Sequence, residues 1–346
     1  MKKIKILLFN KDIVLEDMVK SFSSKIKCDI IRKNHFKSIS FTNEKIVFAF
    51  TVDSIGSNVE LMRFIKRLKD NNIVFNDSFG VILVNSNNSL YTKTLSQQVV
   101  FLLNKMNLSF IGQPMIEVIA DYMNYETWNK LYKDKSLKKI CEIQIEKLAK
   151  RFFDFDKEKI NNPKILAIHS SSYQTSNTLM LWNMIKKNLA GYTINEIEVE
   201  DNKIVDCNGC PFETCLHYAK KNSCYYGGVV IENILPAIEE SDYIIWICPN
   251  YNDSISAKLM AVINRMTVLY RRVSLHEKVI FSVIISGNSG SDSVAKHLIS
   301  ALNLNKGLIL PPNFSIMEIA NDSGKIIKVK DIEKHAYNFA KNIMDY

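Results

Sequence analysis

Residues 244–266 contain three kinds of structure in immediate succession, and they constrain the fold more than any other stretch. The apolar run from Tyr243 to Cys248, rich in isoleucine and aromatic residues, predicts a strand buried on both faces of a parallel sheet. Pro249 ends this run, a polar loop spans 250–254, and apolar residues then recur at helical spacing. Such a loop lies at the carboxyl edge of the sheet, where open α/β proteins bind ligands. It is the first candidate site, and the alternative is an ordinary strand-to-helix connection.

Length and charge narrow the class of protein. A chain of 346 residues is long for a single core, so two domains are expected. No apolar run approaches the ~18 residues of a membrane helix, and the N-terminal apolar segment is too short for a signal peptide. We therefore expect a soluble, cytoplasmic protein. The net charge of +9 comes mainly from dispersed lysines, which favours a solvated surface over a nucleic-acid or membrane partner.

Predicted strands and helices alternate along the whole chain. In the first half the strands are 4–9, 46–51 and 79–84, and the helices are 12–26, 58–69, 92–105 and 137–153. In the second half the strands are 165–169, 193–199, 243–248, 279–286 and a short one near Leu308, and the helices are 177–189, 229–240, 256–270, 292–302 and 332–344. The alternation indicates two doubly wound parallel sheets in tandem, each a three-layer α/β/α domain. We place the domains at 1–155 and 164–346, joined by a charged linker at 156–163.

The two halves also share residues at a constant separation. At an offset of 201, Asn87 and Lys105 fall on Asn288 and Lys306, and at an offset of 198, Arg67 falls on Arg265. Such internal matches indicate two copies of one unit. The copies differ where ligands would bind, since residues 51–54 read Thr-Val-Asp-Ser where residues 249–252 read Pro-Asn-Tyr-Asn. We expect one competent copy and one that has become structural.

A hydroxyl-rich loop follows the first strand of the second half. It runs from His169 to Thr178 and opens directly onto a helix. Hydroxyls and free backbone N–H groups at a helix N-terminus form a phosphate site without any lysine or arginine. The loop matches neither the P-loop nor the Gly-x-Gly-x-x-Gly pattern. A serine-rich N-cap is the structural alternative, but a third polar loop, 286–290, ends a neighbouring strand of the same sheet.

Through these three loops, residues 163–346 resemble the NADPH-dependent FMN reductase and iron-sulfur flavoprotein branch of the flavodoxin-like superfamily. The first half resembles a degenerate copy of that fold. His169 stands where the family usually has glycine. The resemblance implies FMN bound by three loops, whose candidate residues are Ser170, Ser171, Ser172, Ser176, Asn177 and Thr178, then Pro249, Asn250, Tyr251, Asn252 and Ser254, then Ser286, Gly287 and Asn288.

Four of the seven cysteines crowd into a cysteine-rich insertion, residues 206–228. They are Cys207, Cys210, Cys215 and Cys224, separated by two, four and eight residues. Four thiolates can hold an iron-sulfur cluster, as the resemblance implies, or a tetrahedral zinc ion. Redox-active or simply buried thiols are the remaining alternatives. The other three cysteines lie in apolar stretches, where we expect core residues: Cys28, Cys141 and Cys248.

The resemblance implies an FMN-dependent NAD(P)H oxidoreductase that passes electrons to a flavin, quinone or protein acceptor. Its partners would be a nicotinamide nucleotide and an unidentified acceptor, and the sequence shows no general acid or base. The first alternative is a flavodoxin-like electron carrier without its own nicotinamide site. The second is a non-catalytic scaffold whose sites have decayed in both halves. The sequence does not decide the oligomeric state, and a homo-oligomer is compatible with it.

Overall fold

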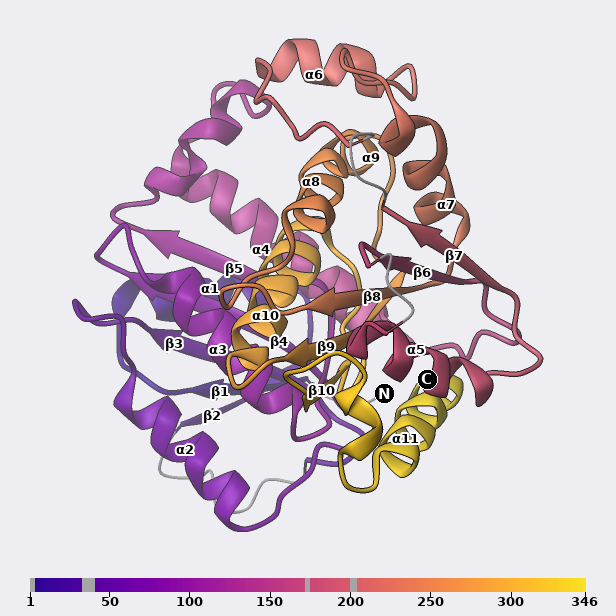
Figure 1. Ribbon diagram of the computed structural model, residues 1–346. Coiled ribbons are helices and arrows are strands. Elements are labelled where there is room, and N and C mark those ends of the chain that lie inside the picture. The colour runs from indigo at the N-terminus through magenta and orange to yellow at the C-terminus, as the bar shows by residue number, and fades with distance from the viewer. Residues whose placement is uncertain (1–3, 33–40, 172–174, 200–203) are drawn as a thin grey trace. The chain divides into compact units, whose positions relative to one another are not determined.

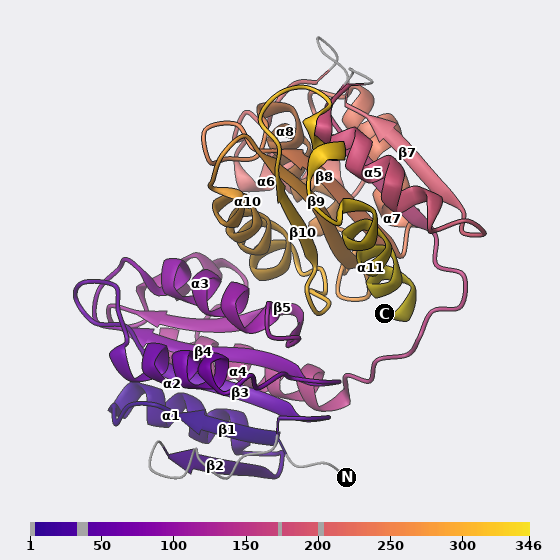
Figure 2. The ribbon, with the colours of Figure 1, turned by 60° about the horizontal axis from the view of Figure 1, so that its bottom comes forward.

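The structure is a computed structural model that describes residues 4–32, 41–171, 175–199 and 204–346. The chain divides into two compact units, Met1–Lys157 and Glu158–Tyr346. We call them the N-terminal unit and the C-terminal unit. Each contains one five-stranded parallel sheet with helices on its faces (Figures 1 and 2).

The N-terminal unit is built on the sheet order β2-β1-β3-β4-β5. Its strands are β1 (Ile4–Leu8), β2 (Cys28–Arg32), β3 (Lys45–Thr51), β4 (Phe79–Ser86) and β5 (Ser109–Ile119). Its helices are α1 (Ile13–Ser23), α2 (Val59–Asp70), α3 (Thr92–Asn104), the 3-10 helix η2 (Met123–Lys130) and α4 (Leu137–Asp154). On one face of the sheet, Phe22 of α1 and Phe152 of α4 are fully buried against strand residues such as Val47. Burial of such side chains contributes about 1.5–3 kcal/mol each.

The C-terminal unit has the sheet order β10-β9-β8-β6-β7. Its strands are β6 (Ile165–His169), β7 (Ile194–Glu198), β8 (Tyr243–Pro249), β9 (Val279–Ser286) and β10 (Ser315–Ile319). Its helices are α5 (Asn177–Lys187), α6 (Phe212–Ala219), η3 (Val230–Ile234), α7 (Leu235–Glu240), α8 (Ala257–Arg265), α9 (Thr267–Tyr270), α10 (Ser291–Leu298), η4 (Ile299–Lys306), η5 (Lys325–Lys328) and α11 (Ile332–Asp345). Counted along its own chain, this unit also orders its strands 2-1-3-4-5. The prediction of two flavodoxin-like sheets in tandem is confirmed.

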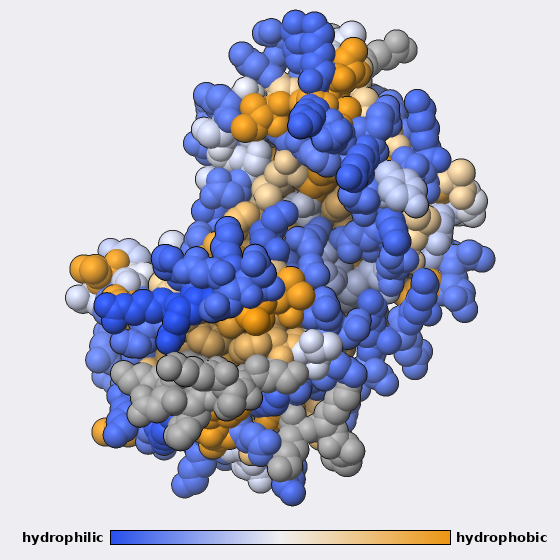
Figure 3. Space-filling model, turned by 90° about the horizontal axis from the view of Figure 1, so that it is seen from below, coloured by the Kyte–Doolittle hydropathy of each residue, from blue (hydrophilic) through white to orange (hydrophobic). Residues whose placement is uncertain are grey.

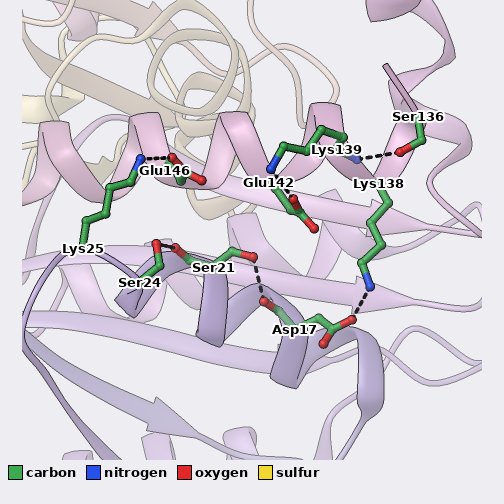
Figure 4. A network of polar contacts seen from close by, with 9 residues as sticks. All are labelled: Asp17, Ser21, Ser24, Lys25, Ser136, Lys138, Lys139, Glu142 and Glu146. Atoms are coloured by element: carbon green, nitrogen blue, oxygen red, sulfur yellow. Dashed lines mark hydrogen bonds and ion pairs between the residues drawn. The ribbon is translucent and has the colours of Figure 1, made fainter. Parts of the chain in front are cut away.

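Exposed charges add little to the stability of the N-terminal unit. Ion pairs link α1 and the residues that follow it to α4, with Lys25 Nζ 2.6 Å from Glu146 Oε2 and Lys138 Nζ 2.5 Å from Asp17 Oδ2 (Figure 4). Such pairs are worth about 0–1 kcal/mol in water. Hydrophilic residues predominate on the face of the molecule seen in Figure 3. No helix among the described residues combines the length and apolar character needed to cross a bilayer.

Several elements differ from the sequence prediction. The edge strand β2 was missed because its residues are only partly buried, and β5 was missed because its register shifts opposite Gly80 and Ile82. The strand predicted near Leu308 is wrong, since Ile309 forms only an isolated bridge with Val279 and the strand is β10. Cys141 and Cys248 are buried, as predicted. Cys28 is only half-buried on β2 and packs against the margin of the core.

The structure matches residues of the two units at a separation of 200 positions, one less than the sequence offset of 201. Ala120 donates its N–H to the carbonyl of Ser86 at 3.1 Å, and Ala320 donates to Ser286 at 3.0 Å. These pairs are 200 positions apart, so the loops that align are Ser-Asn-Asn-Ser at 86–89 and Ser-Gly-Asn-Ser at 286–289. Identical residues making the same bond favour a shared origin, which remains a proposal.

Candidate functional site

Four loops of the C-terminal unit converge at the carboxyl edge of its sheet. They follow β6, β8, β9 and β10, and together they line a pocket of about 650 Å³. A volume of 300–1,000 Å³ is typical of sites for small molecules and cofactors. The pocket lies beside β6 and β8, where the direction of strand succession reverses, which is the usual ligand position in a doubly wound sheet.

The loop after β6 presents an uncapped helix N-terminus to this pocket. Ser176 is the N-cap of α5, yet its side chain accepts no hydrogen bond from the helix. The first backbone N–H groups of α5 therefore remain available to an anion, and the helix dipole favours negative charge there. Ser170 Oγ lies 2.9 Å from Ser256 Oγ, which ties this loop to the start of α8. Ser172 lies outside the described residues.

His169 fixes the loop rather than facing a ligand. Its ring is buried, with Nδ1 3.0 Å from the carbonyl oxygen of Ser171 and Nε2 3.6 Å from Glu196 Oε1. Partial burial acts to raise the pKa of Glu196, but hydrogen bonds from Lys186 and Trp182 outweigh it and hold that pKa below its usual value. The imidazole Nδ1 can donate to the carbonyl of Ser171, so the histidine holds the loop through its backbone while Glu196 of β7 lies beside the ring.

The loop after β8 is a tight turn. Tyr251 and Ser254 exchange backbone hydrogen bonds of 3.3 and 3.1 Å, and the two residues between them, Asn252 and Asp253, have φ values of 52° and 58°. Asparagine and aspartate tolerate this left-handed conformation better than other non-glycine residues. The turn leaves the Tyr251 ring 59% exposed at the pocket.

The loops after β8 and β9 are bonded together. Asn250 Nδ2 donates to Ser286 Oγ and to the carbonyl oxygen of Ser289, both at 2.9 Å. Gly290 permits this approach, because it adopts φ 84° and a Cβ built there would lie 1.7 Å from Asp253 Oδ1. The two loops therefore form one rigid edge of the pocket, and glycine is required at their contact.

Most of the predicted residues do meet. Those that line the pocket are Ser170, Ser171, Ser176, Asn177, Thr178, Pro249, Asn250, Tyr251 and Gly287. Four others do not line it: Asn252 and Ser254 shape the turn, Ser286 is buried beneath the loops, and Asn288 is exposed and bonds to the N–H of Ser289.

Sequence reasoning missed the fourth loop, which supplies Ala320, Asn321 and Ser323 to the pocket, and it also missed Lys258 of α8. Asn177 holds this fourth loop, because its Nδ2 donates to the carbonyls of Ala320 and Asp322 at 3.0 and 2.8 Å. Placing the last strand at 315–319 instead of near Leu308 would have brought the loop to the same edge.

The cysteine-rich insertion forms a second cavity in this unit. All four cysteines line a space of about 180 Å³ together with tyrosines of the insertion and arginines of α8 and its continuation. The predicted metal site is not preformed, since no three His, Cys, Asp or Glu side chains among the described residues are placed to hold a metal ion. Cys215 is fixed on α6, whereas Cys207 and Cys210 precede the helix and Cys224 follows it. As arranged, the thiols fit neither a cluster nor zinc.

The buried cysteines differ chemically from this group. Burial raises the pKa of the Cys248 thiol to about 12 and that of Cys141 to about 11. Thiols that stay protonated in an apolar core are poor nucleophiles.

The chain is similar to one protein family and to several solved structures. Residues 163–322 match the family model described as NADPH-dependent FMN reductase. The chain is similar to the azoreductase from Bacillus anthracis str. Sterne at 16% identity and TM-score 0.38, over 53% of this chain and 100% of that one. It is similar to the NAD(P)H:quinone oxidoreductase from Methanothermobacter marburgensis at 14% identity and TM-score 0.38, over the same shares of the two chains. No curated protein matches.

Proposed function

Because residues 163–322 belong to the NADPH-dependent FMN reductase family, we propose that this protein is a flavin-dependent oxidoreductase that binds FMN in its C-terminal unit. We further propose that it takes electrons from NADH or NADPH and passes them to a flavin, a quinone or a protein. The FMN site is the pocket formed by the four loops.

The uncapped N-terminus of α5 is the observation that carries this proposal. Its open N–H groups, with the hydroxyls of Ser176 and Thr178, match the needs of a phosphate monoester, and no basic residue is required. Ser170 and Ser171 extend the polar wall on the side of β6. The residues present therefore fit the phosphate end of FMN.

The opposite wall fits a flat ring. Pro249, Asn250 and the exposed Tyr251 form an edge that is held in place by the bonds of Asn250 to the third loop. When bound, FMN supplies the acceptor for a hydride from nicotinamide and the means to pass electrons on. The protein's own residues bind and orient the cofactor and shield part of it from water. A dedicated acid or base is not required for this task.

A simple measurement tests the proposal. The purified full-length protein should bind about one FMN and oxidise NADH or NADPH in steady state when an artificial acceptor is added. FMN binding without NAD(P)H oxidation would instead support the alternative of an electron carrier. A colourless protein that does not take up FMN would contradict both and support a decayed scaffold.

The N-terminal unit has a different proposed role. We regard it as a copy of the same fold that no longer binds a cofactor and serves structure. The shared strand order and the paired Ser86–Ala120 and Ser286–Ala320 bonds support a common origin. An iron-sulfur cluster is not part of the proposal, because the four thiols are not arranged to hold one.

A further inference from the structure

The cavity of the cysteine-rich insertion lies apart from the flavin pocket and has no role in the proposed function. The insertion connects β7 to η3 and folds over the C-terminal end of α8 and over α9 (Figure 1). Lys258, near the start of α8, lines the flavin pocket, and Arg265, at its end, lines the cysteine cavity. Seven residues of helix separate these positions by about 10 Å. The cavity is therefore a separate chemical environment.

Arg265 pins both ends of the insertion. Its side chain is 3% exposed, and its guanidinium donates to the carbonyl oxygens of Val205 at 3.3 Å and Gly227 at 2.6 Å. Asn264 supports the same end by donating to Asp206 Oδ1 at 2.9 Å. The four cysteines lie between these anchors, so Arg265 ties the segment that carries them to α8.

Two arginines, Arg265 and Arg271, line the cavity, and the nearby carboxylate of Asp206 bonds instead to Asn264 and to the N–H of Cys207, at 2.9 and 2.6 Å. Arg271 lies 4.4 Å from the centre of the Phe212 ring, and its Nε is buried without a hydrogen-bond partner. Lys306 is next to it and donates to Thr267 Oγ1 at 2.6 Å. Burial, and then the charge of Arg271, lower the pKa of Lys306 to about 8. Within the described ranges, no ion pair joins Arg265, Arg271 or Lys306 to an aspartate or glutamate.

The four thiols line the same cavity as these arginines. Cationic surroundings and partial exposure are the features of reactive cysteines. Cys207 is exposed and Cys210 is partly exposed, so an external reagent can reach both. Their two-residue spacing is the spacing of redox-active dithiols. Cys215 and Cys224 line the same cavity and are also partly exposed.

We propose that the cysteine-rich cavity is a thiol–disulfide exchange site for small anionic disulfides, with Cys207 as the attacking thiol and Cys210 as the resolving thiol. The thiolate of Cys207 attacks one sulfur of the disulfide, whose S–S bond breaks, and one small thiolate leaves and takes up a proton. The thiolate of Cys210 then attacks the mixed disulfide and releases the second small thiolate. The protein loses two electrons to form a Cys207–Cys210 disulfide, and the small disulfide gains them as two thiols. Arg271 and Lys306 attract its carboxylates.

The test uses the reduced full-length protein and two disulfides of opposite charge. The anionic probe is 5,5′-dithiobis(2-nitrobenzoate), and the cationic probe is cystamine. We expect the anionic probe to react faster, and Arg271→Gln and Lys306→Gln each to slow it roughly fivefold to tenfold while leaving cystamine little changed or faster. Arg271→Lys should retain most of the rate. Equal losses for both probes would overturn the electrostatic role.

Mass spectrometry tests the assignment of the two thiols. Wild type treated with one equivalent of probe should contain a Cys207–Cys210 disulfide, and Cys210→Ser should instead retain a mixed disulfide on Cys207. Cys207→Ser should lose the fast reaction, whereas Cys28→Ser, which removes a half-buried thiol outside the cavity, should keep it. One iron or zinc per chain in anaerobically purified protein, with the four thiols unreactive, would overturn the proposal in favour of a metal site.

Discussion

The carboxyl edges of the two sheets have the same topology but opposite hydrogen bonding. In the N-terminal unit, Asp12 caps α1 by accepting from the N–H of Leu15 at 2.9 Å, and Asn58 caps α2 by accepting from Leu61 at 2.9 Å. In the C-terminal unit, the corresponding caps of α5 and α8, Ser176 and Ser256, make no such bond. At these two helices the N-terminal edge satisfies its own backbone, whereas the C-terminal edge leaves the same donors without a side-chain cap.

The bonds across the N-terminal edge go further. Asp12 Oδ1 also accepts from Asn85 Nδ2 at 2.9 Å, and Asn10 Oδ1 accepts from Asn58 Nδ2 at 2.6 Å. These contacts join the loops after β1, β3 and β4 to one another. The Asp12 carboxylate also occupies the helix N-terminus where a phosphate would bind, and like charges there repel. An edge of this topology can thus satisfy its helix N-termini with the protein's own acceptors.

The largest expected effect separates the units. The full chain and a fragment of residues 158–346 should each bind about one FMN, while residues 1–157 should bind none. The reason is the capped and negatively charged N-terminus of α1. Flavin fluorescence quenching during titration measures all three. Tight binding of FMN by the N-terminal fragment would remove the basis of the comparison.

The next effect concerns the contact between the loops after β8 and β9 in the C-terminal unit. Gly290→Ala should weaken FMN at least tenfold, about 1.4 kcal/mol, because the new Cβ collides with Asp253 and forces the loops apart. Gly191→Ala is the matched control. That glycine also has positive φ, 103°, but no atom lies within 4 Å of the added Cβ. The control should lose stability, by roughly 1–2 kcal/mol, and keep its FMN affinity. Equal affinities in the two variants would argue against this loop as a wall of the site.

A smaller effect tests the phosphate position. Ser176→Ala should weaken FMN by a few-fold up to about tenfold, since one hydrogen bond to a charged group is lost while the backbone donors remain. Riboflavin, which lacks the phosphate, should bind both forms equally. Thermal stability should hardly change, because the serine side chain does not cap α5. If riboflavin weakens as much as FMN, the phosphate binds elsewhere.

The smallest expected effect comes from removing a helix cap in the N-terminal unit. Asp12→Ala should cost about 1 kcal/mol of stability through loss of the cap and should leave FMN binding by the full chain unchanged. Differential scanning calorimetry of the N-terminal transition measures the cost. Asp17 also lies on α1, and Asp17→Ala removes its exposed ion pair with Lys138 of α4. This variant should shift the same transition much less. A loss of FMN in Asp12→Ala would contradict a purely structural role for this edge.

The sequence predicted the fold because buried parallel strands such as β8 and β9 are continuous apolar runs. It failed where burial is partial, as in β2, and where strands are irregular, as in β5. The same limit hid part of the site. Loops can be aligned only if their strands are placed correctly, so the misplaced strand near Leu308 concealed Asn321 and Ser323. Composition also cannot show whether four cysteines converge closely enough for a metal.

Arg265 grips the insertion only through the carbonyl groups of Val205 and Gly227, which every amino acid possesses. The residues between those two anchors can therefore change without removing these two bonds. During evolution such a segment could exchange one chemistry for another while the pocket loops at the far end of α8 stay undisturbed. The same property makes the insertion a natural place for an engineer to graft a new reactive loop.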